Sequence, residues 1–187
     1  LILKNNNIII IDYGSQYTQL IARRIREKNV YSEVLPYNVN IKKIISKNPS
    51  GIILSGGPAS VYSKNSPKLN LKLLSLDVPI LGICYGFGLL LQNDGAKIGG
   101  DKKREYGISK LLIKEKSNLI ESVKNNSKVW MSHGDSIESL PKGWMEIAKT
   151  NNDVIAIASN EDSNLYGIQF HPEVVQTEYG NEIISNF

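Results

Sequence analysis

Short apolar segments alternate with helix-like segments through the first half of the chain, and this alternation limits the possible folds more than any other feature. The apolar segments, which are rich in isoleucine and valine and typical of strands, are residues 7–12, 30–35, 51–54 and 79–83. The segments with helical spacing between them are residues 17–28, 41–45 and 67–76. Strands that alternate with helices predict βαβ units and therefore a parallel sheet.

The second half of the chain has a different pattern, in which strand-like segments follow one another with short connections. These segments are residues 108–113, 128–131, 145–148, 154–158 and 165–170. They predict antiparallel strands added to the parallel sheet, and residues 178–187 predict a closing helix. The expected fold is α/β, with an open, mainly parallel mixed sheet flanked by helices. Because the sequence shows no repeat and no interdomain linker, we expect residues 1–187 to form a single domain.

Charge, hydropathy and cysteine content exclude several functional classes. The net charge of +4 is mildly basic, but no aromatic-basic stripe accompanies the scattered lysines, so we expect no nucleic-acid partner. The longest apolar run near the start, residues 8–11, is far shorter than the roughly 20 residues that span a bilayer, so we expect no membrane partner. The single cysteine cannot form an internal disulfide, which predicts a reducing, cytoplasmic location.

The only cysteine lies in the sequence Gly82-Ile83-Cys84-Tyr85-Gly86, directly after an apolar strand and before a helix-like run. This G-x-nucleophile-x-G pattern, in a strand–turn–helix context, is typical of a nucleophile elbow. The thiol would lie at the positive end of a helix, which favours the thiolate. The backbone N–H of Tyr85 would be left to donate to an oxyanion. The alternative interpretation is a buried structural cysteine in a tight turn.

A second glycine-rich turn, Ser55-Gly56-Gly57-Pro58, follows the third predicted strand. Because the carboxyl ends of parallel strands meet at one edge of a sheet, this turn should lie near Cys84 and aim a second backbone N–H at an oxyanion. The alternatives are a phosphate-binding loop and a plain turn. The turn lacks the Gly-Lys-Ser/Thr ending of a P-loop, which argues against nucleotide binding.

His171 and Glu173 follow the strand-like segment that ends at Phe170. Side chains two residues apart in an extended segment point to the same side, and Pro172 stiffens this segment. Glu173 could accept a hydrogen bond from one imidazole nitrogen while the other nitrogen faces Cys84, which suits a general base. The alternative is a chance H-x-E sequence at the surface. Two histidines and one cysteine at these spacings do not match a zinc site, so we expect no metal.

The other histidine, His133, lies in the sequence MSHGD (residues 131–135), which ends a predicted strand. His133 could compete with His171 for the role of base. We assign it instead to the wall of the substrate pocket, and a polar turn without a functional role is the alternative.

The motifs GICYG, SGGP and HPE, in this order, resemble those of the class I glutamine amidotransferases. The resemblance implies a triad of Cys84, His171 and Glu173, with oxyanion-hole donors at the backbone of Gly57 and Tyr85. It also implies that the thiol attacks the side-chain amide of glutamine, that ammonia leaves, and that water hydrolyses a γ-glutamyl thioester. The residues expected to bind the substrate are Gly56, Gly88, Ser132, His133, Gly134 and Asp135.

Longer motifs resemble one branch of that family, the glutaminase domains of GMP synthases, across nearly the whole chain. These motifs are IDYGSQYTQLIARR, KREYG, WMSHGD and QFHPEVVQTEYGNEIISNF. The resemblance implies that ammonia passes to a GMP synthetase (ATP pyrophosphatase) module, fused or separate, which aminates XMP to GMP. That module is absent from this chain. We expect ATP and Mg²⁺ to act in that module and no cofactor in the glutaminase domain.

Three positions depart from the family pattern. Phe87 and Gly88 replace the Met and Gln of CYGMQ, and Gln176 stands where a histidine is usual. Since the missing glutamine normally helps to line the pocket, we expect Gly88→Gln to strengthen glutamine binding. Because the residues of the triad are intact, we still expect an active enzyme.

Two other functions remain open on the sequence. A stand-alone cysteine hydrolase of related fold, such as a peptidase, would use the same nucleophile, although the IDYGSQYTQL segment argues against it. A non-catalytic docking subunit would fit the altered pocket, although intact Cys84, His171 and Glu173 argue against that.

Overall fold

The structure is a computed structural model that describes residues 6–99 and 104–187. The parallel part of the sheet and its helices comprise β1 (Asn7–Asp12), α1 (Thr18–Arg26), β2 (Tyr31–Pro36), α2 (Ile41–Ile45), β3 (Gly51–Leu54), β4 (Ile80–Ile83) and α3 (Tyr85–Asn93). The later elements are β5 (Lys97–Gly99), β6 (Glu105–Ile113), β7 (Lys128–His133), β8 (Ser136–Ser139), β9 (Met145–Thr150), β10 (Ile155–Asn160), β11 (Leu165–Ile168) and α4 (Gly180–Asn186).

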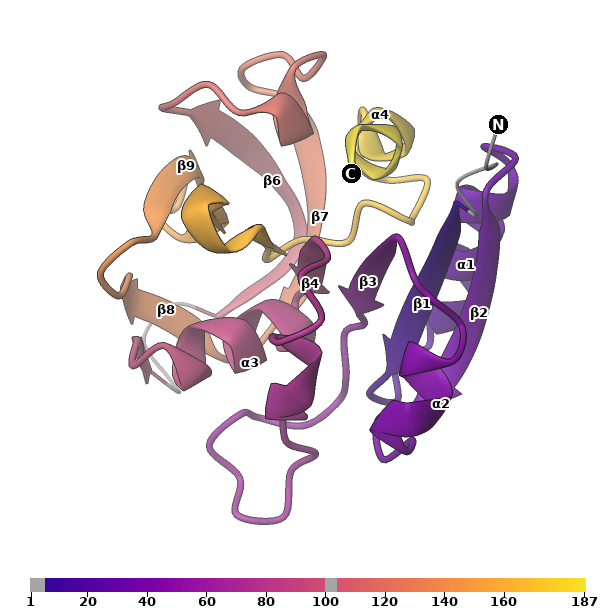
Figure 1. Cartoon of the computed structure of the whole chain (residues 1–187). Helices are drawn as coiled ribbons and strands as arrows, with labels where there is room; N and C mark the ends of the chain where they lie inside the picture. The colour runs from indigo at the N-terminus through magenta and orange to yellow at the C-terminus, as the bar shows by residue number, and fades with distance from the viewer. Residues whose placement is uncertain (1–5, 100–103) are drawn as a thin grey trace.

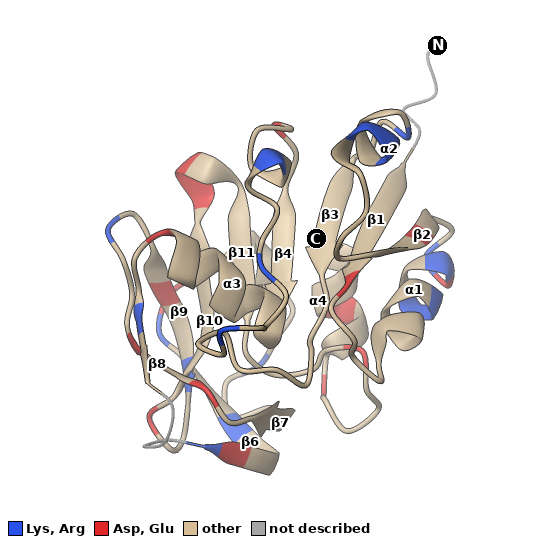
Figure 2. Cartoon of the chain, turned by 90° about the horizontal axis from the view of Figure 1, so that it is seen from below, with Lys and Arg blue, Asp and Glu red and all other residues tan. Residues whose placement is uncertain are grey.

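The main sheet runs in the order β2-β1-β3-β4-β11-β10-β9-β6-β7, and its middle strands can be followed in Figure 2, whereas Figure 1 shows its two ends. Strands β2, β1, β3, β4 and β11 pair in parallel, and β10, β9, β6 and β7 continue the sheet by antiparallel pairing. The α/β class and the mainly parallel, mixed sheet predicted from the sequence are confirmed. Strand β11 pairs with β4, so the residues that follow β11 emerge beside the end of β4.

Helices cover both faces of the sheet, because the strands alternate their side chains between two apolar layers. One layer joins Ile10 of β1 to Ile21 of α1 and Ile183 of α4. The other layer joins Ile9 of β1 to Leu90 of α3. The central strands β3, β4 and β11 carry no charged residue, and the charged side chains lie around them (Figure 2).

The predicted helix over residues 67–76 is wrong. The described chain there is mostly irregular and contains only a short 3-10 helix, η1 (Leu71–Leu73). The Asn70 side chain accepts a hydrogen bond from the backbone N–H of Lys72, and the Ser75 hydroxyl donates to the Lys72 carbonyl. The Asn70 bond caps the start of η1, whereas the Ser75 bond occupies a carbonyl that a longer helix would use, and only a single tight turn forms.

Two short strands, β5 and β8, were not predicted, and they pair antiparallel in a separate small sheet. Each is only three or four residues long, which leaves too few positions for a strand pattern to show in the sequence. Within the described residues, every helix is too short or too polar to cross a lipid bilayer.

Candidate active site

Cys84 lies at the junction of β4 and α3, where the chain reverses from strand to helix. Its backbone has φ 51° and ψ −104°, a conformation that is strained for a residue with a side chain. The Cys84 N–H donates to the Ile168 carbonyl of β11 at 2.7 Å, and the Gly88 N–H donates to the Cys84 carbonyl at 3.1 Å. These two bonds hold the thiol at the start of the helix, as a nucleophile elbow requires.

The flanking glycines of the elbow are required by close packing of the backbone. A Cβ at Gly82 would lie 2.6 Å from the carbonyl carbon of Gly86. A Cβ at Gly86 would collide with the carbonyl oxygen of Leu54 in β3. Because both obstacles are main-chain atoms, neither could move aside for a side chain.

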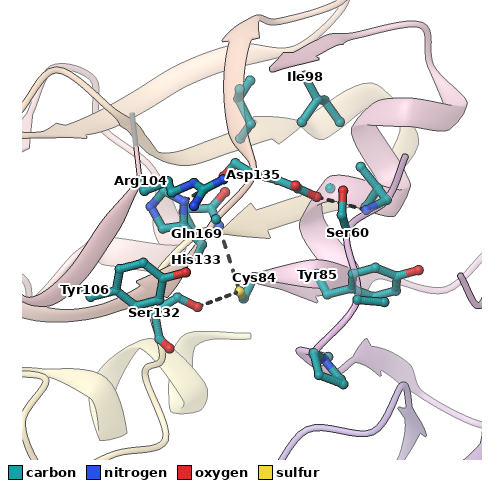
Figure 3. A pocket seen from close by; sticks show the side chains of 17 residues that line it. Ser60, Cys84, Tyr85, Ile98, Arg104, Tyr106, Ser132, His133, Asp135 and Gln169 are labelled. Carbon is teal, nitrogen blue, oxygen red and sulfur yellow. Dashed lines mark hydrogen bonds between the residues drawn. The ribbon is translucent and has the colours of Figure 1, made fainter. Parts of the chain in front are cut away.

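The thiol points toward residues from two other strands (Figure 3). Its Sγ lies 3.7 Å from the Ser132 carbonyl at the end of β7, and 3.9 Å from Nε2 of Gln169 just after β11. Gln169 is buried, so its amide is held inside the cavity rather than in solvent. The site is therefore assembled from β4, β7 and β11.

The imidazole of His171 lies between Glu173 and Cys84. Nδ1 of His171 is 2.8 Å from Oε1 of Glu173, and because an ionised carboxylate can only accept, Nδ1 donates. The nitrogen left to serve Cys84 is then Nε2. Burial lowers the pKa of His171, but the bonds and charges of Cys84 and Glu173 outweigh it and raise the pKa to about 10. The surroundings therefore favour an imidazolium, which suits a group that takes a proton from a thiol.

The backbone around His171 is fixed by several hydrogen bonds. The His171 N–H donates to the Trp130 carbonyl at 3.0 Å, and the Thr177 hydroxyl donates to the His171 carbonyl at 2.7 Å. Arg24 of α1 donates from Nε to the Glu173 carbonyl at 3.2 Å. The His171–Glu173 segment is thus anchored to β7 on one side and to α1 on the other.

The SGGP turn lies beside the thiol, with its two glycines facing different neighbours. Gly57 lines the cavity together with Cys84 and Tyr85. Gly56 does not line the cavity, because a Cβ there would lie 3.1 Å from Cε1 of His171. Gly56 lies against the imidazole and close to Cys84, and its contact with substrate stays a prediction.

The predicted pocket residues other than Gly56 surround a cavity of about 570 Å³ that opens beside the thiol. The predicted residues that line it, besides Cys84, are Gly57, Tyr85, Gly88, Ser132, His133, Gly134 and Asp135. This volume is within the range typical of sites for small molecules. His171 and Glu173 are not part of the cavity lining.

His133 faces the carboxylate of Glu105 and not that of Asp135, two residues further along the chain. Its Nδ1 is 2.6 Å from the Asp135 carbonyl, and its Nε2 is 3.7 Å from Oε2 of the buried Glu105. The carboxylate of Asp135, two residues on, accepts from the Val61 N–H at 2.8 Å instead. Both ring nitrogens thus face protein oxygens, which agrees with a place in the pocket wall. Among the described residues, no group of three or more metal-ligating side chains could hold an ion.

Several cavity residues were not predicted from the sequence. Gln169, Arg104, Tyr106 and Val61 all line the cavity. Gln169 could have been predicted as a site residue from the sequence. It is a polar residue at the end of an apolar strand, and because it lies two positions before His171, its side chain should point to the same side as that of His171. Arg104 and Tyr106 belong to the KREYG motif, for which the sequence alone suggests no role, and Lys103 of that motif lies outside the described residues.

Phe87, the first departure from the family pattern, is a core residue rather than a pocket residue. Its side chain is completely buried and occupies the space above Gly167 of β11, where any Cβ would collide with the ring. Its ring lies 6.0 Å from that of Trp144. The substitution is therefore accommodated on the face of α3 that packs on the sheet.

Gly88→Gln is expected to destabilise the protein, contrary to the expectation from the sequence alone. A Cβ at Gly88 would lie 3.0 Å from Cγ1 of buried Val61. The Val61 carbonyl is held by Gln92 at 3.1 Å, so the valine cannot easily retreat. Overpacking of this kind costs about 1–3 kcal/mol, which a melting curve would detect.

The double variant Gly88→Gln/Val61→Ala is the matched control, because it removes the methyl groups that obstruct residue 88. We expect it to recover the melting temperature and to lower the Michaelis constant for glutamine about 5- to 10-fold through one regained hydrogen bond. A single variant with an unchanged melting temperature and a lower Michaelis constant would show that Val61 is no obstacle.

Comparison with known proteins finds one family model, glutamine amidotransferase class-I, which matches residues 9–187. The GMP synthase [glutamine-hydrolyzing] of Borrelia garinii subsp. bavariensis is 51% identical over 181 residues, covering 96% of this chain and 34% of the relative. That of Brachyspira hyodysenteriae is 50% identical over 187 residues, covering 99% of this chain and 36% of the relative. The chain therefore spans about a third of the length of the curated relatives that it matches.

Solved structures have the same fold. A Thermoplasma acidophilum protein, described as a candidate subunit of GMP synthase, superposes with a TM-score of 0.84 at 27% identity and covers 97% of this chain and 91% of its own. A glutamine amidotransferase from Thermotoga maritima has a TM-score of 0.74 at 20% identity, covers 91% of this chain and 77% of its own, and supports the fold alone.

Proposed function

Because the chain belongs to the class I glutamine amidotransferase family, we propose that it hydrolyses glutamine to glutamate and ammonia, with Cys84 as the nucleophile. The observation that carries the proposal is the strained elbow of Cys84, beside an imidazole of His171 that Glu173 orients and whose pKa Cys84 helps to raise. The thiol also opens onto a cavity large enough for an amino acid. A structural cysteine would need neither the strain nor the paired imidazole.

In the first step, Nε2 of His171 takes the proton of the Cys84 thiol, and the sulfur attacks the side-chain amide carbon of glutamine. The carbonyl oxygen becomes an oxyanion, for which the backbone N–H groups of Gly57 and Tyr85 are the proposed donors. Tyr85 is the first residue of α3, so no carbonyl within that helix can accept from its N–H. The positive end of the helix also favours the negative charge.

In the second step, the oxyanion collapses and the carbon–nitrogen bond breaks. His171 returns its proton to the leaving nitrogen, which departs as ammonia and leaves a γ-glutamyl thioester on Cys84. Water then attacks the thioester, with His171 as the base, and glutamate leaves as the thiol is regenerated. Glu173 keeps Nδ1 protonated throughout and stabilises the imidazolium that forms in each half of the reaction.

The direct test is to incubate the purified chain with glutamine and to measure glutamate and ammonia. We expect the two products in equal amounts, and no ammonia from asparagine, whose amide is one methylene closer to the α-carbon. If glutamine is not consumed while a peptide or a γ-glutamyl peptide is cleaved, the chain is a different cysteine hydrolase.

We further propose that the ammonia serves a GMP synthetase (ATP pyrophosphatase) module, either fused to this domain or present as a separate subunit. The support is that relatives named GMP synthase [glutamine-hydrolyzing] are about three times longer than the part matched here. That module would aminate XMP to GMP with ATP and Mg²⁺, and the reaction would take place in the cytoplasm. Faster glutamine hydrolysis after addition of a synthetase module loaded with its nucleotides would support this partner, and an unchanged rate would oppose it.

A further inference from the structure

The segment between β1 and α1 belongs to the branch-specific IDYGSQYTQLIARR motif, yet the reaction above assigns it no role. The structure shows a well-fixed turn. Oδ1 of Asp12 accepts from the Gly14 N–H at 2.9 Å and from the Thr18 hydroxyl at 2.7 Å. The Tyr17 N–H donates to the Ser15 hydroxyl at 3.0 Å. The Tyr17 carbonyl accepts from the first turn of α1, so the backbone of this residue is fixed on both sides.

The ring of Tyr17 packs on the imidazole of His171. The two ring centroids are 5.1 Å apart, with an angle of 70° between the ring planes, which is an edge-to-face contact. Tyr17 is partly exposed, whereas only 4% of His171 is exposed, so the phenol ring forms part of the cover that keeps the imidazole out of water.

Each other side of the imidazole already has a neighbour that limits its motion. Glu173 holds Nδ1 at 2.8 Å, and the backbone of Gly56 lies so close to Cε1 that a Cβ there would be 3.1 Å away. Cys84 lies close enough to raise the pKa of the imidazole. The charged and titratable groups near the imidazole are therefore Cys84, Glu173 and the Tyr17 phenol. Arg24 reaches only the Glu173 carbonyl at 3.2 Å and shares its charge with Glu27.

We infer that Tyr17 is a positioning residue for the proposed glutaminase reaction: its ring keeps the His171 imidazole aligned between Cys84 and Glu173 while the thiol loses its proton. An edge-to-face contact between two aromatic rings is favourable beyond the area that it buries, so it can hold one ring in place against the other. The inference rests on the proposed function. On this inference, the hydrogen bonds that fix the turn between β1 and α1 serve catalysis as well as folding, because they hold the Tyr17 ring in place.

The test compares three variants of the purified chain. Tyr17→Leu removes the aromatic ring, Tyr17→Phe keeps the ring and removes only the hydroxyl, and Tyr31→Leu is a matched control on the exposed face of β2. We expect Tyr17→Leu to lower kcat for glutamine hydrolysis about 5- to 20-fold, with the Michaelis constant changed less than about 2-fold. We expect Tyr17→Phe to restore most of the rate, and Tyr31→Leu to match the unsubstituted chain.

A second measurement distinguishes positioning from a general loss of structure. The rate at which iodoacetamide alkylates Cys84, followed against pH, reports the fraction of thiolate. We expect its midpoint to move to higher pH in Tyr17→Leu but not in Tyr17→Phe or Tyr31→Leu. This measurement needs no glutamine, so it can fail independently of the proposed function.

Three results would overturn the inference. The first is an unchanged kcat in Tyr17→Leu, and the second is an equal loss in Tyr17→Phe, which would assign the role to the hydroxyl. The third is a lower melting temperature of Tyr17→Leu with an unchanged alkylation profile, which would show a purely structural role. If the unsubstituted chain releases no ammonia from glutamine while the alkylation profile still shifts, the proposed function fails and the contact with His171 stands.

Discussion

Replacing Cys84 by alanine is expected to abolish glutamine hydrolysis, with a loss of about 10⁴-fold or more in kcat. Cys84 is the only cysteine of the chain, so no other thiol can form the thioester. Removal of the nucleophile from a triad leaves only the small contribution of binding and the oxyanion hole. The measurement is glutamate release at saturating glutamine, with a detection limit low enough to register a residual activity of about 10⁻⁵ of the original.

The control for this prediction is retention of fold and of substrate binding. Alanine keeps the Cβ of residue 84, so the strained backbone at φ 51° should persist in the variant. We expect an unchanged melting temperature to within a few degrees and measurable glutamine binding by calorimetry. Residual hydrolysis of about a tenth of the original rate, in a variant that is correctly folded, would mean that another group attacks the amide.

Replacing His171 by alanine is expected to lower kcat about 10³- to 10⁴-fold, with a small effect on the Michaelis constant. An unassisted thiol is only a few per cent thiolate at neutral pH, and the leaving nitrogen would lose its proton donor. His171 does not line the cavity, so substrate binding should be largely unaffected. Steady-state glutaminase kinetics on the purified variant would measure both constants.

Two further variants make this prediction specific. Glu173→Gln should cost less, about 10- to 10³-fold, because the carboxylate orients the imidazole and does not itself transfer the proton. His133→Gln is the matched control, since both histidines are equally buried but His133 faces Glu105 and the cavity. We expect His133→Gln to change mainly the Michaelis constant. A larger loss of kcat from His133→Gln than from His171→Ala would show that the wrong histidine has been assigned.

The sequence was sufficient to predict those parts of the fold that depend on local pattern. The buried strands β1, β3 and β4 are visible in the sequence as apolar runs, because both faces of each strand are covered by other parts of the protein. The turn at Cys84 could be predicted because its glycines stand at positions where only a hydrogen fits beside the backbone. Local chemistry and tertiary packing agree at these positions, so a short window of sequence is informative.

The remaining features depend on contacts between distant residues. Glu105 lies opposite His133 only because β6 and β7 pair in one register, and no local pattern reveals that pairing. Asp135 has the same spacing from His133 as Glu173 has from His171, yet its carboxylate turns to the Val61 N–H. The position of Val61 also decides whether a side chain fits at residue 88. Such choices among partners are made by tertiary packing.

The most direct test of the proposed chemistry is to capture the intermediate on Cys84. The chain is mixed with glutamine, quenched in acid within the first turnovers, digested, and analysed by mass spectrometry. We predict one added γ-glutamyl group on the peptide that contains Cys84, absent without glutamine and absent from Cys84→Ala. Two results would contradict the assignment of Cys84 as the nucleophile. One is release of glutamate and ammonia at full rate with no adduct on Cys84 at any quench time, and the other is an adduct on a different residue.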